Sequence, residues 1–261
     1  MQYFSGLLLI FSLLFGFHQE KVTTVYLIGD STMADYSNNY DEGKDYMKTR
    51  YPITGWGQVF QPVLNRKNLN ELSHIIKTDS VIIDNRARGG RSTRTFFEEG
   101  RWSSVYKTLK KGDLVLMQFG HNDAAETKPE RYVTVEGYKE YIRLYVNQTR
   151  QKGGVPVVIT PVSRNYPWKD AKLGNVHGDY YKAAVEVAKE LDAHLIDLTQ
   201  RSMDHFTEKG EEYVTQKYFM NFGPGKYEAY PEGSSDNTHF MPEGAKAVAK
   251  LVFEGLRDLR N

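Results

Sequence analysis

The 261-residue chain contains no cysteine. Disulfide bonds, thiolate catalysis and a cysteine-based zinc site are therefore excluded, and so is a lipid anchor on an N-terminal cysteine. Closely spaced histidine ligands are missing as well, because the sequence has neither a His-x-His nor a His-Glu-x-x-His motif. We therefore expect no metal and no other cofactor.

The chain also lacks an excess of charge of either sign. Its 34 basic and 33 acidic residues give a formal net charge of +1, so neither a nucleic acid nor an anionic membrane is favoured as a partner. Hydrophobic residues make up 40% of the sequence and aromatic residues 13%, which is sufficient for a packed core. Because no linker, repeat or low-complexity tract interrupts the chain, we expect one domain.

Long apolar runs are scarce. The one candidate, residues 7–17, is uncharged but shorter than the roughly 20 residues of a membrane span. It predicts a signal peptide over residues 1–19, followed by the single domain over residues 20–261. A retained N-terminal anchor is the alternative, since no basic residue precedes the run and no Ala-x-Ala-like site precedes Glu20. Either way we expect a secreted or periplasmic protein whose mature chain does not insert into the membrane.

Strand-like apolar runs alternate with helical patterns along the chain. This alternation predicts an α/β fold: a three-layer α/β/α sandwich around a mostly parallel five-stranded sheet. We expect residues 36–51 to form a surface loop and residues 210–235 a long loop leading to Asp236. The expected strands are 25–28, 81–83, 114–117, 155–159 and 194–196, and the expected helices are 56–64, 103–109, 138–146, 180–191 and 242–259.

Two segments at opposite ends of the chain hold the parts of a serine hydrolase triad. Ser31 follows the first predicted strand in a Gly-Asp-Ser-Thr turn, and Asp236 and His239 lie near the C-terminus. A serine needs a base to take its proton and a third group to orient that base. Taken alone, Ser31 could instead cap a helix, and Asp30 is expected to hold the turn through backbone hydrogen bonds.

Two further turns offer hydrogen-bond donors. Gly89 and Gly90 follow the second predicted strand, and Asn122 follows the third. Ligands of open α/β sheets bind beyond the carboxyl ends of the strands, where these turns should meet. Donors placed around a developing oxyanion are a large catalytic contribution, although Asn122 alone could also be a simple turn residue.

Taken in order, these blocks resemble the SGNH (GDSL-type) hydrolases. Residues 26–34, 55–58, 85–94 and 118–123 are similar, more narrowly, to the rhamnogalacturonan acetylesterases of carbohydrate esterase family 12. The resemblance covers the chain from about Val25 to the last helix. It implies a flavodoxin-like fold and a serine esterase that removes O-acetyl groups from pectic polysaccharide through an acyl-enzyme.

The resemblance also assigns roles to residues. Ser31 is the expected nucleophile, His239 its base and Asp236 the support of the imidazole. The expected oxyanion hole consists of the Ser31 N–H, the Gly90 N–H and the Asn122 side chain.

Substrate contacts are less specifically indicated. Arg91 and His121 are candidate substrate-binding residues. The arginines of residues 86–94 could pair with galacturonate carboxylates, but we expect at least two of the four to pair with internal acids instead, and His121 could be a structural histidine.

The expected partner is an acetylated polysaccharide or oligosaccharide, and no oligomeric state is indicated. The same machinery could serve other acylated sugars such as acetylxylan, or a small lipid ester. A catalytically idle carbohydrate-binding relative is the alternative outside the enzymes.

Overall fold

The computed structural model describes residues 22–38 and 40–259. The predicted signal peptide or anchor, residues 1–19, lies outside the described residues. None of the helices within the described part is long and apolar enough to span a bilayer.

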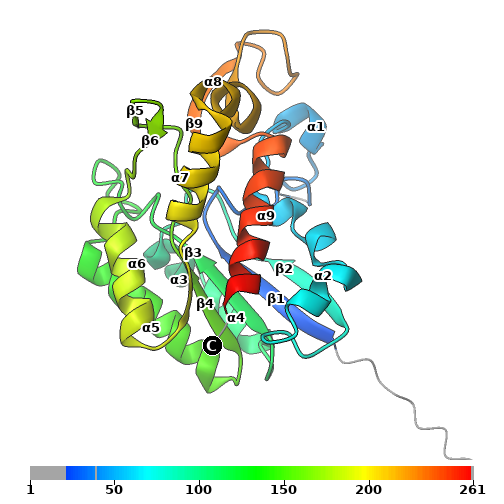
Figure 1. The fold of residues 1–261 in the computed structure, drawn as a ribbon, viewed down its shortest axis with the longest axis vertical. Helices are drawn as coiled ribbons and strands as arrows, with labels where there is room; N and C mark the ends of the chain where they lie inside the picture. The colour runs from blue at the N-terminus through cyan, green and yellow to red at the C-terminus, as the bar shows by residue number, and fades with distance from the viewer. Residues whose placement is uncertain (1–21, 39, 260–261) are drawn as a thin grey trace, which may run out of the picture.

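A five-stranded parallel sheet forms the centre of the fold (Figure 1), in the order β2-β1-β3-β4-β7. All five expected strands are confirmed, and the sheet has no antiparallel member. This strand order is the flavodoxin-like one, in which ligands bind beyond the carboxyl ends of the strands where the order reverses. The strands are β1 (Val22–Gly29), β2 (Ser80–Asn85), β3 (Leu114–Gln118), β4 (Val155–Ile159) and β7 (His194–Ile196).

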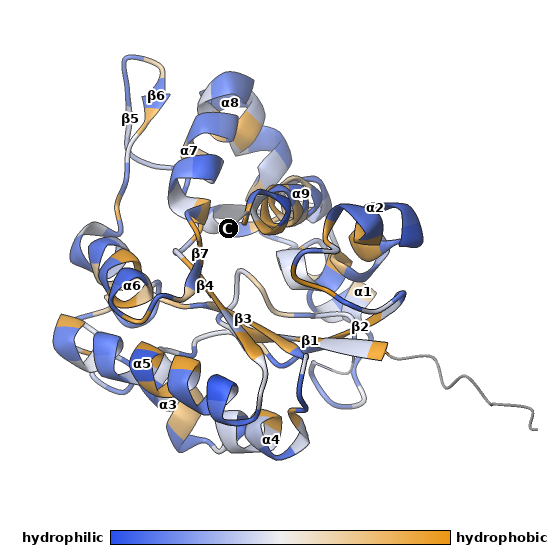
Figure 2. Ribbon diagram, turned by 60° about the horizontal axis from the view of Figure 1, so that its bottom comes forward, coloured by the Kyte–Doolittle hydropathy of each residue, from blue (hydrophilic) through white to orange (hydrophobic). Residues whose placement is uncertain are grey.

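Helices cover both faces of the sheet, and Figure 2 shows the sheet between two helical layers. Successive side chains of a strand point to opposite faces, so Val25 and Leu27 pack into one core cluster and Tyr26 and Ile28 into the other. The expected three-layer sandwich is therefore confirmed. One layer contains η1 (Trp56–Val59), η2 (Gln61–Leu64), α2 (Arg66–Glu71), α7 (Leu198–Lys209) and α9 (Pro242–Asp258), and the other α3 (Thr93–Glu98), α4 (Arg101–Thr108), α5 (Val135–Gln151) and α6 (Gly178–Glu190).

Several segments differ from the expectation. The single helix expected at 56–64 is two 3-10 helices, and Pro62, which suits a first helical turn, lies in the first turn of the second one, η2. Residues 210–235 are not one long loop. They contain α8 (Glu211–Tyr213), the π-helix η3 (Val214–Tyr218), the strand β8 (Phe219–Phe222) and the start of β9 (Ser234–Phe240). Residues 36–51 include a short helix, α1 (Tyr46–Thr49), and a hairpin, β5 (Trp168–Lys169) with β6 (Lys172–Leu173), follows β4.

Candidate active site

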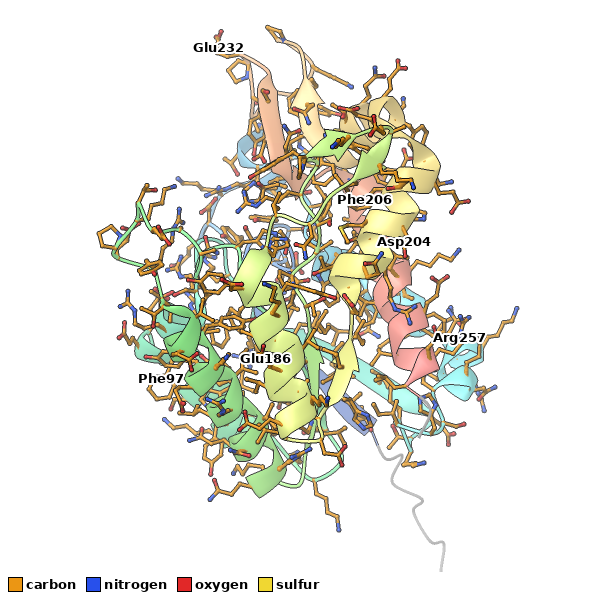
Figure 3. The ribbon with its side chains drawn as sticks, turned by 60° about the vertical axis from the view of Figure 1, so that its left-hand side comes forward. Phe97, Glu186, Asp204, Phe206, Glu232 and Arg257 are labelled. Carbon is orange, nitrogen blue, oxygen red and sulfur yellow. The ribbon has the colours of Figure 1, made fainter. Side chains whose placement is uncertain are left out.

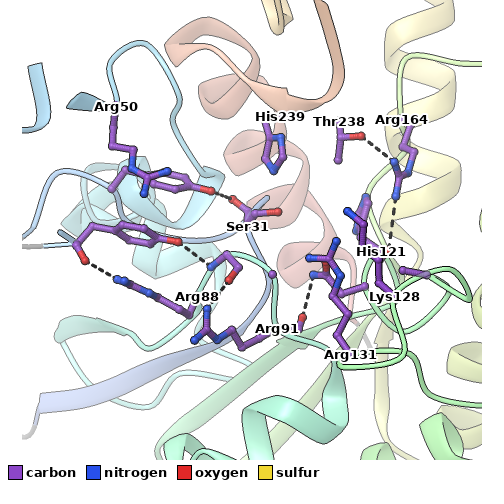
Figure 4. Close-up of a pocket in the computed structure, with 16 residues that line it drawn as sticks. Ser31, Arg50, Arg88, Arg91, His121, Lys128, Arg131, Arg164, Thr238 and His239 are labelled. Atoms are coloured by element: carbon purple, nitrogen blue, oxygen red, sulfur yellow. Dashed lines mark hydrogen bonds between the residues drawn. The ribbon is translucent and has the colours of Figure 1, made fainter. Parts of the chain in front are cut away.

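The segments that follow β1, β2 and β3 line one pocket of about 580 Å³ (Figure 4). The strand β9, far along the chain, reaches the same pocket, and the chain ends are thus brought together as the triad hypothesis requires. Asp236 does not line the pocket itself and contacts a residue that does. The expected site residues in the lining are Ser31, Gly90, Arg91, His121, Asn122 and His239.

Ser31 lies in a turn directly after β1. Asp30 holds this turn as expected, because its Oδ1 accepts hydrogen bonds from the N–H and the hydroxyl of Thr32 at 2.9 and 2.8 Å. The Tyr36 hydroxyl donates to the Ser31 carbonyl oxygen at 2.9 Å and fixes the turn from the other side. The next helix among the described residues, α1, has Asp45 as its N-cap, so the alternative of Ser31 as a helix cap is wrong.

A large bulge shapes β9 where it pairs with β8. Met220 pairs with Asp236, whereas the preceding residue, Phe219, pairs with Phe240. One step along β8 therefore corresponds to four along β9, and residues 237–239 form the bulge. Bulges re-aim side chains next to active sites, and this one carries His239, which lines the same pocket as Ser31.

The bulge brings Asp236 and His239 into direct contact. His239 Nδ1 lies 2.6 Å from Asp236 Oδ2, while Asp236 Oδ1 accepts the N–H groups of Thr238 and His239 at 2.7 and 3.0 Å. Burial opposes ionisation of this carboxyl, but the hydrogen bond and charge of His239, with the two backbone donors, hold the pKa of Asp236 below its usual value. An ionised carboxylate is what orients an imidazole in a triad. Figure 4 shows the His239 and Ser31 side chains facing the same pocket.

Residues outside the bulge hold it in place. The Asn165 N–H donates to the Asn237 carbonyl oxygen at 2.9 Å, and Asn165 Nδ2 and Asn221 Nδ2 both donate to Asn237 Oδ1, at 3.0 and 2.9 Å. Arg164 Nη1 donates to Thr238 Oγ1 at 2.8 Å. The loop after β4 therefore sets the position of His239.

Two residues that line the pocket, Gly90 and Ser31, have backbone N–H groups without a partner in the described part of the chain. Gly90 has a φ of +79°, a conformation that favours glycine. Within the described part of the chain its N–H has no hydrogen-bond acceptor, and neither does the N–H of Ser31. The Gly89 N–H, in contrast, donates to the Tyr40 hydroxyl at 3.0 Å. The geometry thus leaves Gly90, rather than Gly89, free for an oxyanion.

Asn122 adds a side-chain donor next to Gly90. Its Nδ2 donates to the Arg91 carbonyl oxygen at 2.9 Å, and the residue is only 8% exposed. An amide carries two donors, so one hydrogen fixes the orientation of the group and the other remains for a ligand.

The neighbouring Asp123 fixes the turn that carries Asn122. Its carboxyl accepts the N–H and hydroxyl of Thr93 at 2.8 and 2.6 Å and the Gly120 N–H at 3.1 Å. Burial raises the pKa of Asp123 to about 7 in spite of the hydrogen bonds from Thr93. The turn after β3 is thereby joined to the start of α3.

His121 is both a pocket residue and a buried, hydrogen-bonded one. Its Nδ1 lies 3.1 Å from Asp30 Oδ2, and its ring contacts that of His177 at 4.7 Å between centroids. Burial opposes ionisation of Asp30, but the charge and hydrogen bond of His121, together with Thr32, hold the pKa of Asp30 below its usual value. Burial, and then the charge of His121, lower the pKa of His177 to about 3.

A chain of buried hydrogen bonds runs beneath Ser31. Trp56 Nε1 donates to Gln118 Oε1 at 2.9 Å, and Gln118 Nε2 donates to Thr32 Oγ1 at 2.6 Å. The Thr32 hydroxyl donates to Asp30, which in turn contacts His121. These five residues come from three of the four sequence blocks that carry the family resemblance, so the blocks are physically connected.

The arginines of residues 86–94 serve largely internal contacts. Arg86 pairs with Asp84, Arg91 with Glu99 and Arg94 with Glu98. The expectation that at least two of the four arginines pair with internal acids is therefore confirmed. Arg88 and Arg91 still line the pocket, and Arg88 lies over the Tyr40 ring at 3.6 Å.

Several pocket residues could not be recognised in the sequence. Lys128 and Arg131 belong to the loop after β3, and Arg164 to the loop after β4. The sequence indicates only that these residues follow the carboxyl end of a predicted strand. Many residues without a function share that position. Within the described ranges, no group of three or more His, Asp or Glu side chains is placed to hold a metal ion.

Comparison with known proteins agrees with this geometry. The model of the GDSL-like lipase/acylhydrolase family matches residues 27–247. The chain is 38% identical over 236 residues to the probable rhamnogalacturonan acetylesterase YesY of Bacillus subtilis (strain 168), covering 90% of this chain and 93% of that protein. It is 34% identical over 240 residues to the rhamnogalacturonan acetylesterase RhgT of the same strain, covering 92% of each.

A solved structure shows the same fold. The crystal structure of the protein YxiM from Bacillus subtilis matches with a TM-score of 0.70 and 25% sequence identity, covering 91% of this chain. This chain spans 57% of the length of that structure.

Proposed function

This chain belongs to the GDSL-like lipase/acylhydrolase family, and on that basis we propose that it is a serine esterase that removes O-acetyl groups from rhamnogalacturonan, a pectic polysaccharide. The observation that carries the proposal is the convergence of Ser31, His239 and three donors on one pocket. The names of two relatives at 38% and 34% identity support the acetylated pectic substrate.

In the proposed reaction His239 takes the proton of Ser31, whose Oγ attacks the acetyl carbonyl carbon. Asp236 keeps the proton on Nδ1 of His239 and stabilises the imidazolium, without accepting a proton itself. The contact of 2.6 Å between Asp236 Oδ2 and His239 Nδ1 supports this role. His239 then protonates the departing sugar oxygen, which leaves as a hydroxyl, and water, deprotonated by His239, hydrolyses the acetyl ester on Ser31 to release acetate.

The negative charge that forms on the acetyl oxygen is held by three donors in this proposal. They are the N–H groups of Ser31 and Gly90 and the second amide hydrogen of Asn122. Preorganised donors of this kind act in the transition state and need no rearrangement during the reaction. The unpaired Gly90 N–H supports this assignment.

The character of the pocket supports a sugar rather than a lipid ester. Charged and polar side chains make up most of the lining, and burial of an acyl chain against unpaired polar groups is unfavourable. We further propose a secreted or periplasmic location, with residues 1–19 as a signal peptide and residues 20–261 as the hydrolase domain, supported by the apolar run at 7–17. N-terminal sequencing of exported protein tests this.

The test of the function is acetate release from acetylated rhamnogalacturonan, with acetylxylan and p-nitrophenyl acetate as comparison substrates. We expect strong release from the pectic polymer and a loss of about 10⁴-fold or more in kcat for Ser31→Ala, with an unchanged unfolding transition. Activity of Ser31→Ala within about tenfold of the parent would remove Ser31 from the mechanism. Cleavage of p-nitrophenyl acetate alone would keep the esterase and discard the pectic substrate.

A further inference from the structure

The pocket around Ser31 is strongly cationic. Six of its lining side chains carry positive charge: Arg50, Arg88, Arg91, Lys128, Arg131 and Arg164 (Figure 4). Among the described lining residues none is an Asp or a Glu. Because the whole chain has a net charge of only +1, this concentration of charge is local to the pocket.

Four of the six cations already have partners. Arg50 pairs with Asp41 at 2.7 Å and Arg91 with Glu99 at 3.0 Å. Arg88 donates to the Tyr40 carbonyl oxygen at 2.6 Å, and Arg164 donates to Thr238 of the β9 bulge. These four side chains are therefore engaged in contacts within the protein.

The side chains of the remaining two cations, Lys128 and Arg131, donate no hydrogen bond within the described part of the chain. The Glu130 carboxylate lies 3.9 Å from Arg131 Nε, and Nε is buried without a hydrogen-bond acceptor. In the described part of the chain the Lys128 ammonium group has no acceptor either. The Arg131 side chain is 22% exposed and lines the pocket together with the exposed Lys128. The part of the guanidinium group that faces the pocket and the Lys128 ammonium group are therefore available to an anionic ligand.

Both residues lie next to the predicted oxyanion hole. They belong to the segment that begins at Asn122, and one turn joins them, since the Arg131 N–H donates to the Lys128 carbonyl oxygen at 3.0 Å. Arg131 Nη1 lies 3.4 Å from the position that a Cβ atom on Gly90 would occupy. An anion held here would therefore lie within one sugar residue of the reacting ester.

We propose that Lys128 and Arg131 form a carboxylate-binding subsite that holds a uronate group of the bound polysaccharide. This inference rests on the proposed function, because rhamnogalacturonan has a carboxylate on every galacturonate residue. Arginine suits the planar carboxylate through paired N–H donors, and lysine adds a point charge. The subsite selects acidic over neutral acetylated sugars and orients the ester towards Ser31.

The test compares two substrates on each enzyme. One is an acetylated rhamnogalacturonan oligosaccharide, and the other is the same oligosaccharide with its uronate carboxyls reduced to primary alcohols. We expect the parent to prefer the uronate by about tenfold or more in kcat/KM, and Lys128→Met/Arg131→Met to reduce this preference to about threefold or less. Added salt should reduce the parent's preference and leave that of the variant nearly unchanged.

The ratio is measured within one enzyme, so a partly unfolded preparation does not alter it. Lys128→Met alone, at an exposed position, should reduce the ratio in the same direction if the double variant does not fold. Lys182→Met removes one exposed positive charge on α6, outside the pocket, and should keep the parent's preference.

Three outcomes would overturn the proposal. If the parent cleaves both oligosaccharides equally, or the double variant keeps the full preference, the subsite is wrong while the esterase function stands. If the parent releases acetate from neither oligosaccharide but hydrolyses p-nitrophenyl acetate, the pectic substrate fails and the subsite fails with it.

Discussion

His239 Nδ1 lies 2.6 Å from Oδ2 of Asp236, three residues earlier on the same strand. On a regular strand, residues three apart point to opposite faces of the sheet. The pair meets only because residues 237–239 bulge out of the β8–β9 ladder. The Asp-x-x-His spacing therefore brings the two side chains together only in combination with the bulge.

Replacement of Asp236 by asparagine should lower kcat by about 10³–10⁴-fold, less than the replacement of Ser31. Asparagine keeps the shape, but it no longer holds the proton on Nδ1 or stabilises the imidazolium. Steady-state kinetics on p-nitrophenyl acetate measure the effect. Asp204→Asn, on the exposed side of α7 (Figure 3), is the matched control. An Asp236→Asn variant as active as this control would reassign the third member of the triad.

Asn122→Ala should lower kcat by about 10²–10³-fold and change KM little, because the lost donor acts on charge that forms in the transition state. Asn70→Ala in the exposed part of α2 is the control for the substitution itself. The measurement is kcat and KM on one acetyl ester for each variant. A rise in KM at constant kcat would show that Asn122 binds the ground state instead.

Asn165→Ala tests whether the loop after β4 positions the bulge. It removes the side-chain donor to Asn237 and the acceptor of Trp168 Nε1. We expect a loss of about 2 kcal/mol in the free energy of unfolding and a fall of about tenfold or more in kcat from displacement of His239. Denaturant unfolding and kinetics are measured together. If stability falls while kcat stays at the parent's value, Asn165 supports the fold but not the catalytic geometry.

The buried His177 should make the fold sensitive to acid. Its pKa is about 3 in the folded chain, against a usual value of 6.5, so between these values the unfolded chain binds a proton that the folded chain excludes. Stability is therefore fully present above pH 6.5 and falls as the pH falls towards 3, by up to about 1.4 kcal/mol per pH unit.

His177→Gln keeps a donor for the Val162 carbonyl oxygen, which His177 Nε2 contacts at 2.8 Å. Its free energy of unfolding should fall less steeply than the parent's, by about 1 kcal/mol per pH unit between pH 6 and 4.5. Urea titrations at several pH values measure both slopes. Parallel slopes would mean that His177 does not titrate differently in the two states.

The elements that could be predicted from the sequence are those with a clear run or stripe of apolar residues. The central strands β1, β3 and β4 are mostly buried, the edge strands β2 and β7 are partly exposed, and the positions of all five are confirmed. The helix α7 was missed because the buried stripe Leu198, Thr199, Ser202 and Phe206 includes two hydroxyl residues. Ser202 Oγ donates to the Leu198 carbonyl oxygen, which makes its burial possible. Figure 3 labels Phe206, the large apolar member of that stripe.

The part of the site that lies in short sequence motifs could be predicted. The turns with Ser31, Gly90 and Asn122 meet because they follow strands of one sheet. Which of the surrounding cations are paired depends on three-dimensional packing. Arg91 pairs with Glu99, whereas Nε of Arg131 is buried without a hydrogen-bond acceptor. No local pattern distinguishes those two arginines.

The chain of hydrogen bonds from Trp56 to His121 has a consequence for the evolution of the enzyme. Each polar group in it is buried and depends on its neighbour, so a single replacement leaves another group unsatisfied. In a library of variants, substitutions of Trp56, Gln118 and Thr32 should survive only in compatible combinations. The motifs that contain these residues would then be retained in related enzymes even where the substrate changes, because together they form the hydrogen-bond network that supports the turn of Ser31.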